Sequence, residues 1–269
     1  MKNLLLVSDL DGTLLTSSQQ ISEENIQAIR KFEDQGGLFT IATGRTEQAV
    51  ASYIMQLNLT TPLILYNGAK IYCPVTQKVL FERNMVIPEE FWAFALSKAS
   101  EDWAMLVYRD GEVYAPWRNA LLEYHERKDG VVCSDLPEDT QDQAVTKLLL
   151  IARNSSDLIS IEKKAGEIGF PAEIVYSEHN YLEILPYGVS KGTSLIELLK
   201  LLPNKELFTI AVGDNLNDLA IIREADHSFA VENAHPTLKT HATSLTVHHE
   251  NHAIADIING IMNNNELLA

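Results

Sequence analysis

Short apolar segments alternate with amphipathic ones through the first quarter of the chain. Residues 4–8 form an apolar run that ends in polar residues, which predicts a buried strand with Asp9 at its carboxyl end. The next segment predicts a helix, because Ser22 can cap its first turn and Ile26 and Phe32 lie on one helical face. The chain is therefore expected to open with a strand followed by a helix.

The same alternation continues beyond this helix. Residues 38–42 predict a second strand, residues 46–57 a second helix, and residues 63–66 a third strand that runs into Asn67-Gly68. Strands that alternate with helices form parallel sheets, because each helix carries the chain back to the edge where the next strand begins. The first part of the chain therefore predicts a parallel sheet.

The pattern changes in the middle of the chain. Asp110-Gly111 separates strand-like runs at residues 105–109 and 112–115, and an Asp-Gly pair in this setting predicts a hairpin with a two-residue turn. Beyond the hairpin the pattern predicts a helix at residues 157–168. It also predicts strands at residues 147–152, 173–176 and 181–185. These elements predict a mixed sheet with helices packed on it, which we interpret as an inserted second domain over residues 84–185.

The first pattern returns after the insertion. Helices are expected at residues 191–202 and 219–224, and strands at residues 207–212 and 228–231. These elements can complete the first sheet. The predicted fold class is therefore α/β, with a parallel-sheet core formed by residues 1–83 and 186–269.

Length and charge limit the possible partners. A chain of 269 residues can form two domains of ordinary size. The 21 Lys and Arg residues against 37 Asp and Glu residues give a formal net charge of -16, which repels nucleic acid and anionic membranes. We therefore expect neither as a partner, and no pattern in the sequence indicates an oligomeric state.

No segment predicts export or insertion into a membrane. Residues 1–7 are mostly apolar, but Asp9 and Asp11 follow at once and interrupt any signal-peptide core. No later apolar run has the length that a membrane span needs. Cys73 and Cys133 lie far apart and without metal-ligand spacing, as is typical of a reducing compartment. We therefore expect a cytoplasmic protein.

Carboxylates follow two of the predicted core strands. Asp9 and Asp11 come directly after the first strand, and Asp214 and Asp218 come directly after a later one. Open α/β sheets bind ligands beyond the carboxyl ends of their strands, and two acidic strand ends in one crevice favour a hard cation such as Mg²⁺. An isolated Asp-x-Asp can also be a turn with solvated charges, so its position after a strand is what indicates function.

Groups that could receive a phosphoryl group lie at other element ends. Thr43-Gly44-Arg45 ends the second strand and opens its helix, where a hydroxyl and free backbone N–H groups can bind phosphate, although these residues could equally be a helix cap. Lys191 opens the helix after the insertion and could supply a fixed positive charge, whereas an isolated lysine is usually solvated.

Together these segments resemble the four ordered motifs of the haloacid dehalogenase superfamily: Asp9-x-Asp11-Gly12-Thr13, Thr43, Lys191, and Gly213-Asp214-x-x-Asn217-Asp218. Nearly the whole chain is similar to the Cof-type sugar-phosphatase branch, which is indicated by Thr43-Gly44-Arg45, Asn67-Gly68-Ala69 and Gly188-Val189-Ser190-Lys191-Gly192. The resemblance implies a three-layer, Rossmann-like core with an α/β cap domain inserted between the second and third motifs.

Two positions depart from the pattern of this branch. Glu232 precedes Asn233 where relatives often carry a glycine, and His252 follows Asn251 where a glycine is also common. Neither position belongs to the four motifs, so the departures concern local loop shape.

The resemblance also implies roles for individual residues. Asp9 would be the nucleophile and Asp11 the general acid and base, and Thr43 and Lys191 would assist catalysis. Mg²⁺ would be held by Asp9, by the backbone carbonyl of Asp11 and by Asp214. The residues expected to hold phosphate are Leu10, Thr43, Gly44, Arg45, Lys191 and Asn217, with Asp218 in support.

The predicted function is Mg²⁺-dependent hydrolysis of phosphate monoesters, either sugar phosphates or other small phosphorylated metabolites, through an aspartyl-phosphate. A phosphotransferase or sugar-phosphate mutase would use the same intermediate and stays an alternative. A receiver-like phospho-switch is disfavoured, because Asp11 would act as a built-in base and shorten the lifetime of the phosphoryl group. An ion pump with this chemistry is excluded by the lack of membrane segments.

Two further groups of residues allow a functional and a structural interpretation. Tyr108, Tyr114, Trp117 and Arg118 lie around the hairpin and could contact a leaving group, but aromatic residues beside strands more often pack. The segment His248-His249-x-x-His252 could be a transition-metal site, but its spacing matches no recognised scaffold and indicates surface residues.

Overall fold

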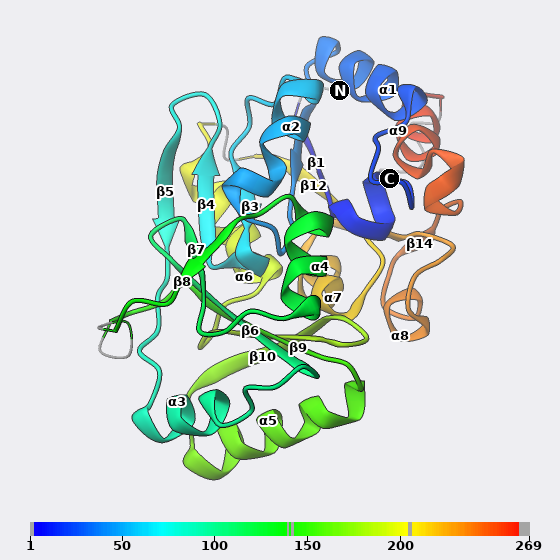
Figure 1. The fold of residues 1–269 in the computed structure, drawn as a ribbon. Helices are drawn as coiled ribbons and strands as arrows, with labels where there is room; N and C mark the ends of the chain where they lie inside the picture. The colour runs from blue at the N-terminus through cyan, green and yellow to red at the C-terminus, as the bar shows by residue number, and fades with distance from the viewer. Residues whose placement is uncertain (1–2, 139, 141–142, 204–205, 264–269) are drawn as a thin grey trace. The chain divides into compact units, whose positions relative to one another are not determined.

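The computed structural model describes residues 3–138, 140, 143–203 and 206–263. The chain divides into two compact units (Figure 1). The first unit comprises Met1–Gly44, Ala51–Phe81 and Ser190–Ala269, and the second comprises Arg45–Val50 and Glu82–Val189.

The first unit is built on a five-stranded parallel sheet in the order β14-β13-β12-β1-β2. Its strands are β1 (Leu4–Ser8), β2 (Leu38–Ile41), β12 (Phe208–Gly213), β13 (His227–Ala230) and β14 (Ser244–Leu245). All five residues of β1 are buried, as expected of a central parallel strand covered on both faces. The predicted strand at residues 4–8 and the predicted parallel core are confirmed.

Helices cover both faces of this sheet. They are α1 (Glu23–Asp34), α2 (Glu47–Leu57), α6 (Lys191–Leu201), α7 (Leu219–Glu224), α8 (Pro236–Lys239) and α9 (Ala253–Asn263). The crossover β1-α1-β2 and the crossover β12-α7-β13 run in opposite directions across the sheet, so right-handed connections place α1 and α7 on opposite faces. In Figure 1, α9 lies beside α1, and α6 packs with α7. The predicted three-layer α/β core is therefore confirmed.

Local signals explain why α1 begins where it does. The side chain of Ser22 accepts a hydrogen bond from the backbone N–H of Asn25, as predicted. Ile26, Ile29 and Phe32 then bury one face of the helix. The cap fixes the start of the helix, and the apolar face fixes its orientation on the sheet.

A small three-stranded sheet extends the first unit. Its strands are β3 (Leu63–Leu65), β4 (Lys70–Cys73) and β5 (Lys78–Glu82), and β3 and β4 are antiparallel. β3 continues the parallel order of the core only through an isolated bridge between Ala42 and Ile64. The third predicted strand is therefore present, but its main hydrogen-bonded partner is the unpredicted β4.

The second unit contains a six-stranded sheet in the order β10-β11-β9-β6-β7-β8. Its strands are β6 (Trp103–Arg109), β7 (Glu112–Ala115), β8 (Cys133–Asp135), β9 (Lys147–Ala152), β10 (Ala172–Glu178) and β11 (Tyr181–Pro186), and its helices are α3 (Glu89–Leu96), α4 (Ala120–Asp129) and α5 (Ser155–Ile168). The predicted hairpin is confirmed: Arg109 pairs with Glu112, and both Asp110 and Gly111 have positive φ. The β7–β8 pair is parallel and the others are antiparallel, so the sheet is mixed, as predicted.

The two faces of this second sheet differ in character. Met105, Leu148 and Ile184 point into an apolar core with residues of α3 and α5. Neighbouring positions in the strands face the other way, where Lys147 and Glu183 form a buried ion pair with 2.9 Å between Nζ and Oε2. This unit therefore buries a polar cluster as well as a hydrophobic core.

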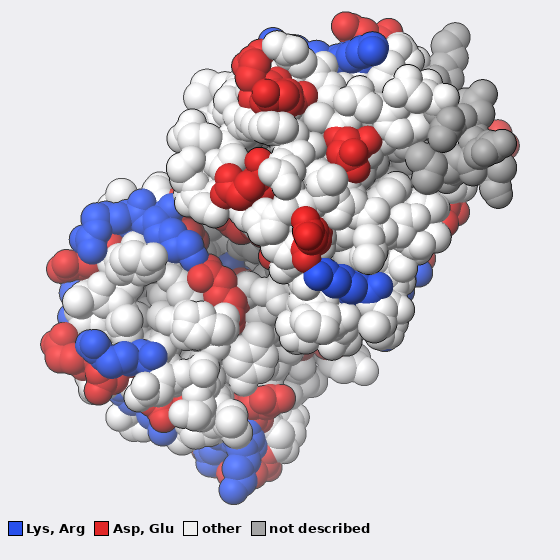
Figure 2. Space-filling model, turned by 90° about the vertical axis from the view of Figure 1, so that its right-hand side faces the viewer, with Lys and Arg blue, Asp and Glu red and all other residues white. Residues whose placement is uncertain are grey.

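None of the helices in the described residues is both long enough and apolar enough to cross a membrane. On the face shown in Figure 2, Lys and Arg side chains lie in separate groups among Asp and Glu side chains, and no continuous basic surface is visible on that face.

Candidate active site

Asp9 lies where β1 ends, at the carboxyl edge of the parallel sheet. Its backbone N–H donates to Val212 O at 2.9 Å, so the strand ladder between β1 and β12 fixes its position. Its side chain is buried. A buried carboxylate requires a compensating charge or hydrogen bonds, which the neighbouring elements provide.

Lys191 provides the positive charge. It is the first residue of α6, whose N-cap Ser190 accepts from the N–H of Thr193, and its side chain is 0% exposed. Its Nζ donates to Oδ1 of Asp9 and to Oδ1 of Asp218, each at 2.6 Å. A lysine that sequence alone could equally place at the surface is thus buried between two carboxylates.

Asp214 and Asp218 come from the segment after β12. Carboxylate oxygens of Asp9, Asp214 and Asp218 all lie within 4.8 Å of one another. Asp218 is held by protein donors, because its Oδ1 accepts from Lys191 and its Oδ2 accepts from the N–H groups of Asp214 and Asn215 at 2.9 and 3.2 Å. Asp9 and Asp214 are therefore the better candidates for metal ligands, and Asp218 is suited to orienting them.

The electrostatics of this cluster favour the binding of a cation. Burial raises the pKa of Asp9 to about 7 and raises the pKa of Asp214 well above its usual value, and neighbouring carboxylates, including that of Asp11, add to both shifts. Burial opposes the charge on Lys191, but Asp218 and Asp9 outweigh it and raise the lysine pKa. Hard oxygen ligands with an excess of negative charge are the donor set that a divalent cation prefers. The residues present therefore fit a divalent metal site.

Asp11 belongs to a tight loop that approaches Asp214. The loop spans Leu10–Leu14, and its Gly12 has φ of +76°. A Cβ atom added to Gly12 would lie 2.5 Å from Oδ2 of Asp214. Glycine is required here both for the left-handed backbone and for the close approach.

Thr43 and Asn217 lie on neighbouring segments of the first unit, and Asn67 connects them. Thr43 is buried after β2, and its carbonyl accepts from the N–H of Asn67 at 2.9 Å. Asn217 Nδ2 donates to Oδ1 of Asn67 at 3.1 Å. Asn67 itself is buried and has φ of +52°. Sequence reasoning gave Asn67 no role in the site, although its position after a strand and before Gly68 was a signal for special backbone geometry.

Other predicted residues are placed less directly. Leu10 is buried in the loop, and Gly44 follows Thr43 at the end of the first of the three segments that form the first unit. Arg45 is buried but falls in the second unit, so its predicted contact with phosphate stays a prediction.

The residues around the hairpin of the second unit have structural contacts. Tyr108 is buried, with its hydroxyl 3.3 Å from Nε2 of His125. Trp117 Nε1 donates to Trp103 O at 2.8 Å, and Arg118 donates to Cys133 O at 3.2 Å. Tyr114 packs against the apolar core. These contacts give the four residues structural roles, and their contact with a leaving group stays a prediction.

The parallel sheet brings acidic strand ends together in a cluster that fits a divalent cation, as in α/β enzymes that bind ligands at this edge. The family model described as haloacid dehalogenase-like hydrolase matches residues 6–258. The chain therefore belongs to the haloacid dehalogenase-like hydrolases, a superfamily whose members use a divalent metal.

Similar proteins cover nearly the whole chain. The 5-amino-6-(5-phospho-D-ribitylamino)uracil phosphatase YcsE of Bacillus subtilis is 29% identical over 90% of this chain and 89% of its own. The HMP-PP phosphatase of Klebsiella pneumoniae is 28% identical over 90% and 89%. A crystal structure of a haloacid dehalogenase-like hydrolase from Bacteroides thetaiotaomicron superposes with a TM-score of 0.81 at 25% identity, covering 97% of this chain and 100% of that one. The predictions of the superfamily, of its Cof-type branch and of a phosphatase-type enzyme are confirmed.

Proposed function

We propose that this enzyme hydrolyses phosphate monoesters of small metabolites by forming an aspartyl-phosphate on Asp9. The observation that carries the proposal is the buried contact of Lys191 with both Asp9 and Asp218, at 2.6 Å each, beside the carboxylate of Asp214. This arrangement holds one carboxylate at a fixed place in a site suited to a cation. A carboxylate is a weak nucleophile toward a phosphate dianion, so charge neutralisation and positioning are the main requirements.

In the first half of the reaction, an oxygen of Asp9 attacks phosphorus in line with the ester oxygen. The bond from phosphorus to the ester oxygen breaks, and Asp11 donates a proton to that oxygen so that it leaves as an alcohol. Lys191 stays hydrogen-bonded to Asp9 and keeps its side chain oriented. The products of this half are the alcohol and the aspartyl-phosphate.

In the second half, Asp11 is a carboxylate and acts as the base. It takes a proton from water, whose oxygen attacks phosphorus while the bond from phosphorus to Asp9 breaks. Inorganic phosphate leaves, and both aspartates return to their starting states. Splitting one difficult displacement into two is the benefit of covalent catalysis.

Asp9, Asp214 and the backbone carbonyl of Asp11 would hold Mg²⁺. When bound, Mg²⁺ would neutralise negative charge on the carboxylates and on the phosphoryl group. Thr43, Asn217, Lys191 and backbone N–H groups at Leu10 and Gly44 would bind the phosphoryl oxygens, with Arg45 as a further candidate. The inserted domain predicted over residues 84–185, which lies within the second unit, would act as the cap that selects the leaving group.

The two similar phosphatases support a small organic phosphate as the substrate. One is named as a phosphatase of 5-amino-6-(5-phospho-D-ribitylamino)uracil and the other as a phosphatase of HMP-PP. Sugar phosphates belong to the same size class and stay within the proposal. A polymeric substrate is disfavoured, because the net charge of -16 repels nucleic acid.

A phosphotransferase would share the first half-reaction and differ in the acceptor. Incubation with a labelled hexose phosphate separates the two functions: a phosphatase transfers the label to water as inorganic phosphate, and a mutase or phosphotransferase transfers it to a second sugar position. Label on a sugar acceptor would refute hydrolysis as the main activity.

The substitution Asp9→Asn tests the proposal. Activity against a panel of phosphorylated metabolites should require Mg²⁺ and should be lost with EDTA. Asp9→Asn should lower kcat by at least about a thousandfold, because removing a nucleophile has this effect in other covalent enzymes. Asp110→Asn changes an exposed carboxylate at a hairpin turn and is the matched control. Activity of Asp9→Asn within tenfold of wild type, with an unchanged circular dichroism spectrum, would exclude Asp9 as the nucleophile.

A further inference from the structure

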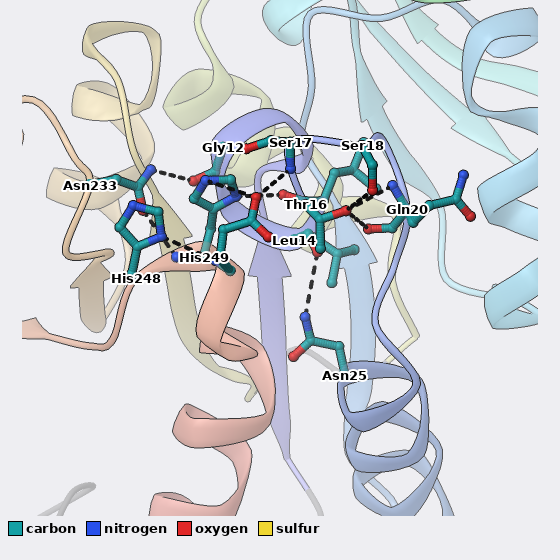
Figure 3. Close-up of polar contacts among 12 residues, drawn as sticks. Gly12, Leu14, Thr16, Ser17, Ser18, Gln20, Asn25, Asn233, His248 and His249 are labelled. Carbon is teal, nitrogen blue, oxygen red and sulfur yellow. Dashed lines mark hydrogen bonds and ion pairs between the residues drawn. The ribbon is translucent and has the colours of Figure 1, made fainter.

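The loop that carries Asp11 is held from outside by side chains distant in sequence. Figure 3 shows these contacts around Gly12, Leu14 and Ser17. The donors to the loop carbonyls come from α1 and from the segment after β13, and one carboxylate accepts from a loop N–H. None of these side chains belongs to the acidic cluster.

Asn233 joins the loop to the C-terminal segment. Its Nδ2 donates to Gly12 O at 2.8 Å, and its Oδ1 accepts from the backbone N–H of His249 at 3.1 Å. A carbonyl can only accept and an N–H can only donate, so the two partners fix the orientation of the carboxamide. Asn233 therefore sets the position of Gly12 relative to His249.

His249 holds the next part of the loop. Its Nδ1 lies 2.7 Å from Leu15 O, and because a carbonyl oxygen only accepts, Nδ1 carries the proton. The ring is buried. Next to it, Oε1 of Glu250 accepts from the N–H of Ser17 at 2.7 Å.

Asn25 repeats the bridging arrangement from the side of α1. Its Nδ2 donates to Leu14 O at 3.4 Å, and its Oδ1 accepts from the N–H of Ala255 at 2.9 Å. The carbonyls of Gly12, Leu14 and Leu15 thus each accept from a side chain that is itself anchored in the first unit.

The held loop has little freedom to shift without changing the site. Gly12 lies so close to Asp214 that an added Cβ would be 2.5 Å from its Oδ2. Asp11 immediately precedes Gly12, so its backbone and side chain follow any movement of this contact. Proton transfer requires the acid to lie within hydrogen-bond distance of the leaving oxygen, so small displacements reduce the rate.

We propose that Asn233 and His249 are positioning residues that clamp the Gly12–Leu15 backbone and thereby hold Asp11 in place for proton transfer. The inference rests on the proposed function, in which Asp11 is the general acid. Asn233 and His249 act through the loop and do not contact the reacting atoms.

Substitutions at His249 separate positioning from general stability. His249→Leu removes the donor to Leu15 O, whereas His249→Asn can present its Nδ2 near the position of Nδ1 and restore that donor. His241→Leu is the matched control, because His241 is exposed and contacts Arg223 and Thr237 rather than the loop. Asn233→Asp removes the donor to Gly12 O with little change in shape and provides a second, independent variant.

The first measurement is hydrogen–deuterium exchange of a peptide covering residues 10–20. Exchange should be faster in His249→Leu and Asn233→Asp than in wild type, and should return toward wild type in His249→Asn. Exchange in His241→Leu should match wild type. This readout does not depend on activity, and unchanged exchange in both clamp variants would overturn the proposal.

The second measurement compares kcat/KM for an alkyl phosphate with kcat/KM for 4-nitrophenyl phosphate. Nitrophenolate leaves without protonation, so misplacing Asp11 should affect it far less. We expect His249→Leu and Asn233→Asp to lose about tenfold to hundredfold on the alkyl ester and less than about threefold on the nitrophenyl ester, with His249→Asn partly rescued. Equal losses on both esters would indicate a merely structural role and overturn the proposal.

The proposed function can fail separately. If wild type hydrolyses neither ester with Mg²⁺ present, the phosphatase proposal fails and the positioning role fails with it, whatever the exchange data show. If wild type is active and the ratio of the two kcat/KM values is unchanged in the variants, only the positioning role fails.

Discussion

Removing the buried charge of Lys191 should reveal how the carboxylates depend on it. Lys191→Met keeps an unbranched side chain of similar length but leaves Asp9 and Asp218 without their shared donor. Both carboxylates are buried, Asp218 completely. Removal of one partner from a buried ion pair typically costs about 3–5 kcal/mol, because the remaining charge is desolvated and unpaired. We therefore expect the free energy of unfolding of Lys191→Met, measured at neutral pH without metal, to be lower than that of wild type by an amount in this range.

The loss should depend on pH in a defined direction. The pKa of Asp9 is already raised to about 7 by burial, and Lys191 opposes this rise, so the substitution should raise it further. A carboxyl group whose folded pKa is raised contributes most stability below its unfolded pKa of about 4 and loses it as pH rises through the folded value. The deficit of Lys191→Met relative to wild type should therefore be smaller at pH 5 than at pH 8.

Urea denaturation in EDTA, followed by circular dichroism, measures these free energies. A second substitution, Asp218→Asn, removes one of the two orphaned charges while retaining an oxygen that can accept from the N–H of Asp214. Lys191→Met/Asp218→Asn should therefore be more stable than the sum of the single effects predicts, with a coupling of at least about 1 kcal/mol.

Lys147→Met provides the control for this cycle. Lys147 is also buried, but it pairs with Glu183 in the second unit. Its effect on stability should add to that of Asp218→Asn without coupling. If the coupling free energy between Lys191→Met and Asp218→Asn is as small as that between Lys147→Met and Asp218→Asn, Lys191 does not stabilise Asp218 in the way described.

Two further predictions test the loop and the second unit. Gly12→Ala should lower kcat/KM by about a hundredfold or more, because the added Cβ would contact Asp214. Gly111 has a similar positive φ but open space around it, so Gly111→Ala should retain activity. Equal activities of the two variants would contradict this explanation. Burial lowers the pKa of His125 to about 3, so the folded state disfavours its protonation. The contribution of neutral His125 to stability is therefore complete above the unfolded pKa near 6.5 and is lost as the pH falls. Between pH 7 and pH 5, the free energy of unfolding of wild type should decrease by about 2 kcal/mol more than that of His125→Gln. An equal decrease in both proteins, measured by urea denaturation, would contradict this prediction.

The core strands and the acidic cluster were predictable because each carries a local signal. β1 and the strand before Asp214 are continuous apolar runs, which is typical of strands buried on both faces. Carboxylates directly after such strands must emerge at the same edge of a parallel sheet. The pattern therefore predicts that Asp9 and Asp214 lie near each other, and in the structure their carboxylate oxygens lie within 4.8 Å.

The residues that support the cluster had no comparable signal. Asn67 contacts Asn217 across 150 residues, Asn233 contacts Gly12 across 221, and His249 contacts Leu15 across 234. A single asparagine or histidine in a loop predicts a turn or a solvated surface, and only the folded chain shows its partner. The expectation of surface residues at 248–252 is wrong for His249, which is buried against the loop.

Charge balance distinguishes the two aspartates after β12. Asp9, Asp11, Asp214 and Asp218 would bring four negative charges if all were ionised, whereas Lys191 brings one positive charge. Lys191 and two backbone N–H groups satisfy Asp218, which is therefore suited to fixing the lysine rather than binding a metal. Burial raises the pKa of Asp214, the carboxylates of Asp9 and Asp218 add to the shift, and Lys191 opposes it only in part. A phosphate dianion would add to this negative charge, so a divalent cation held by Asp9 and Asp214, as proposed above, would favour substrate binding.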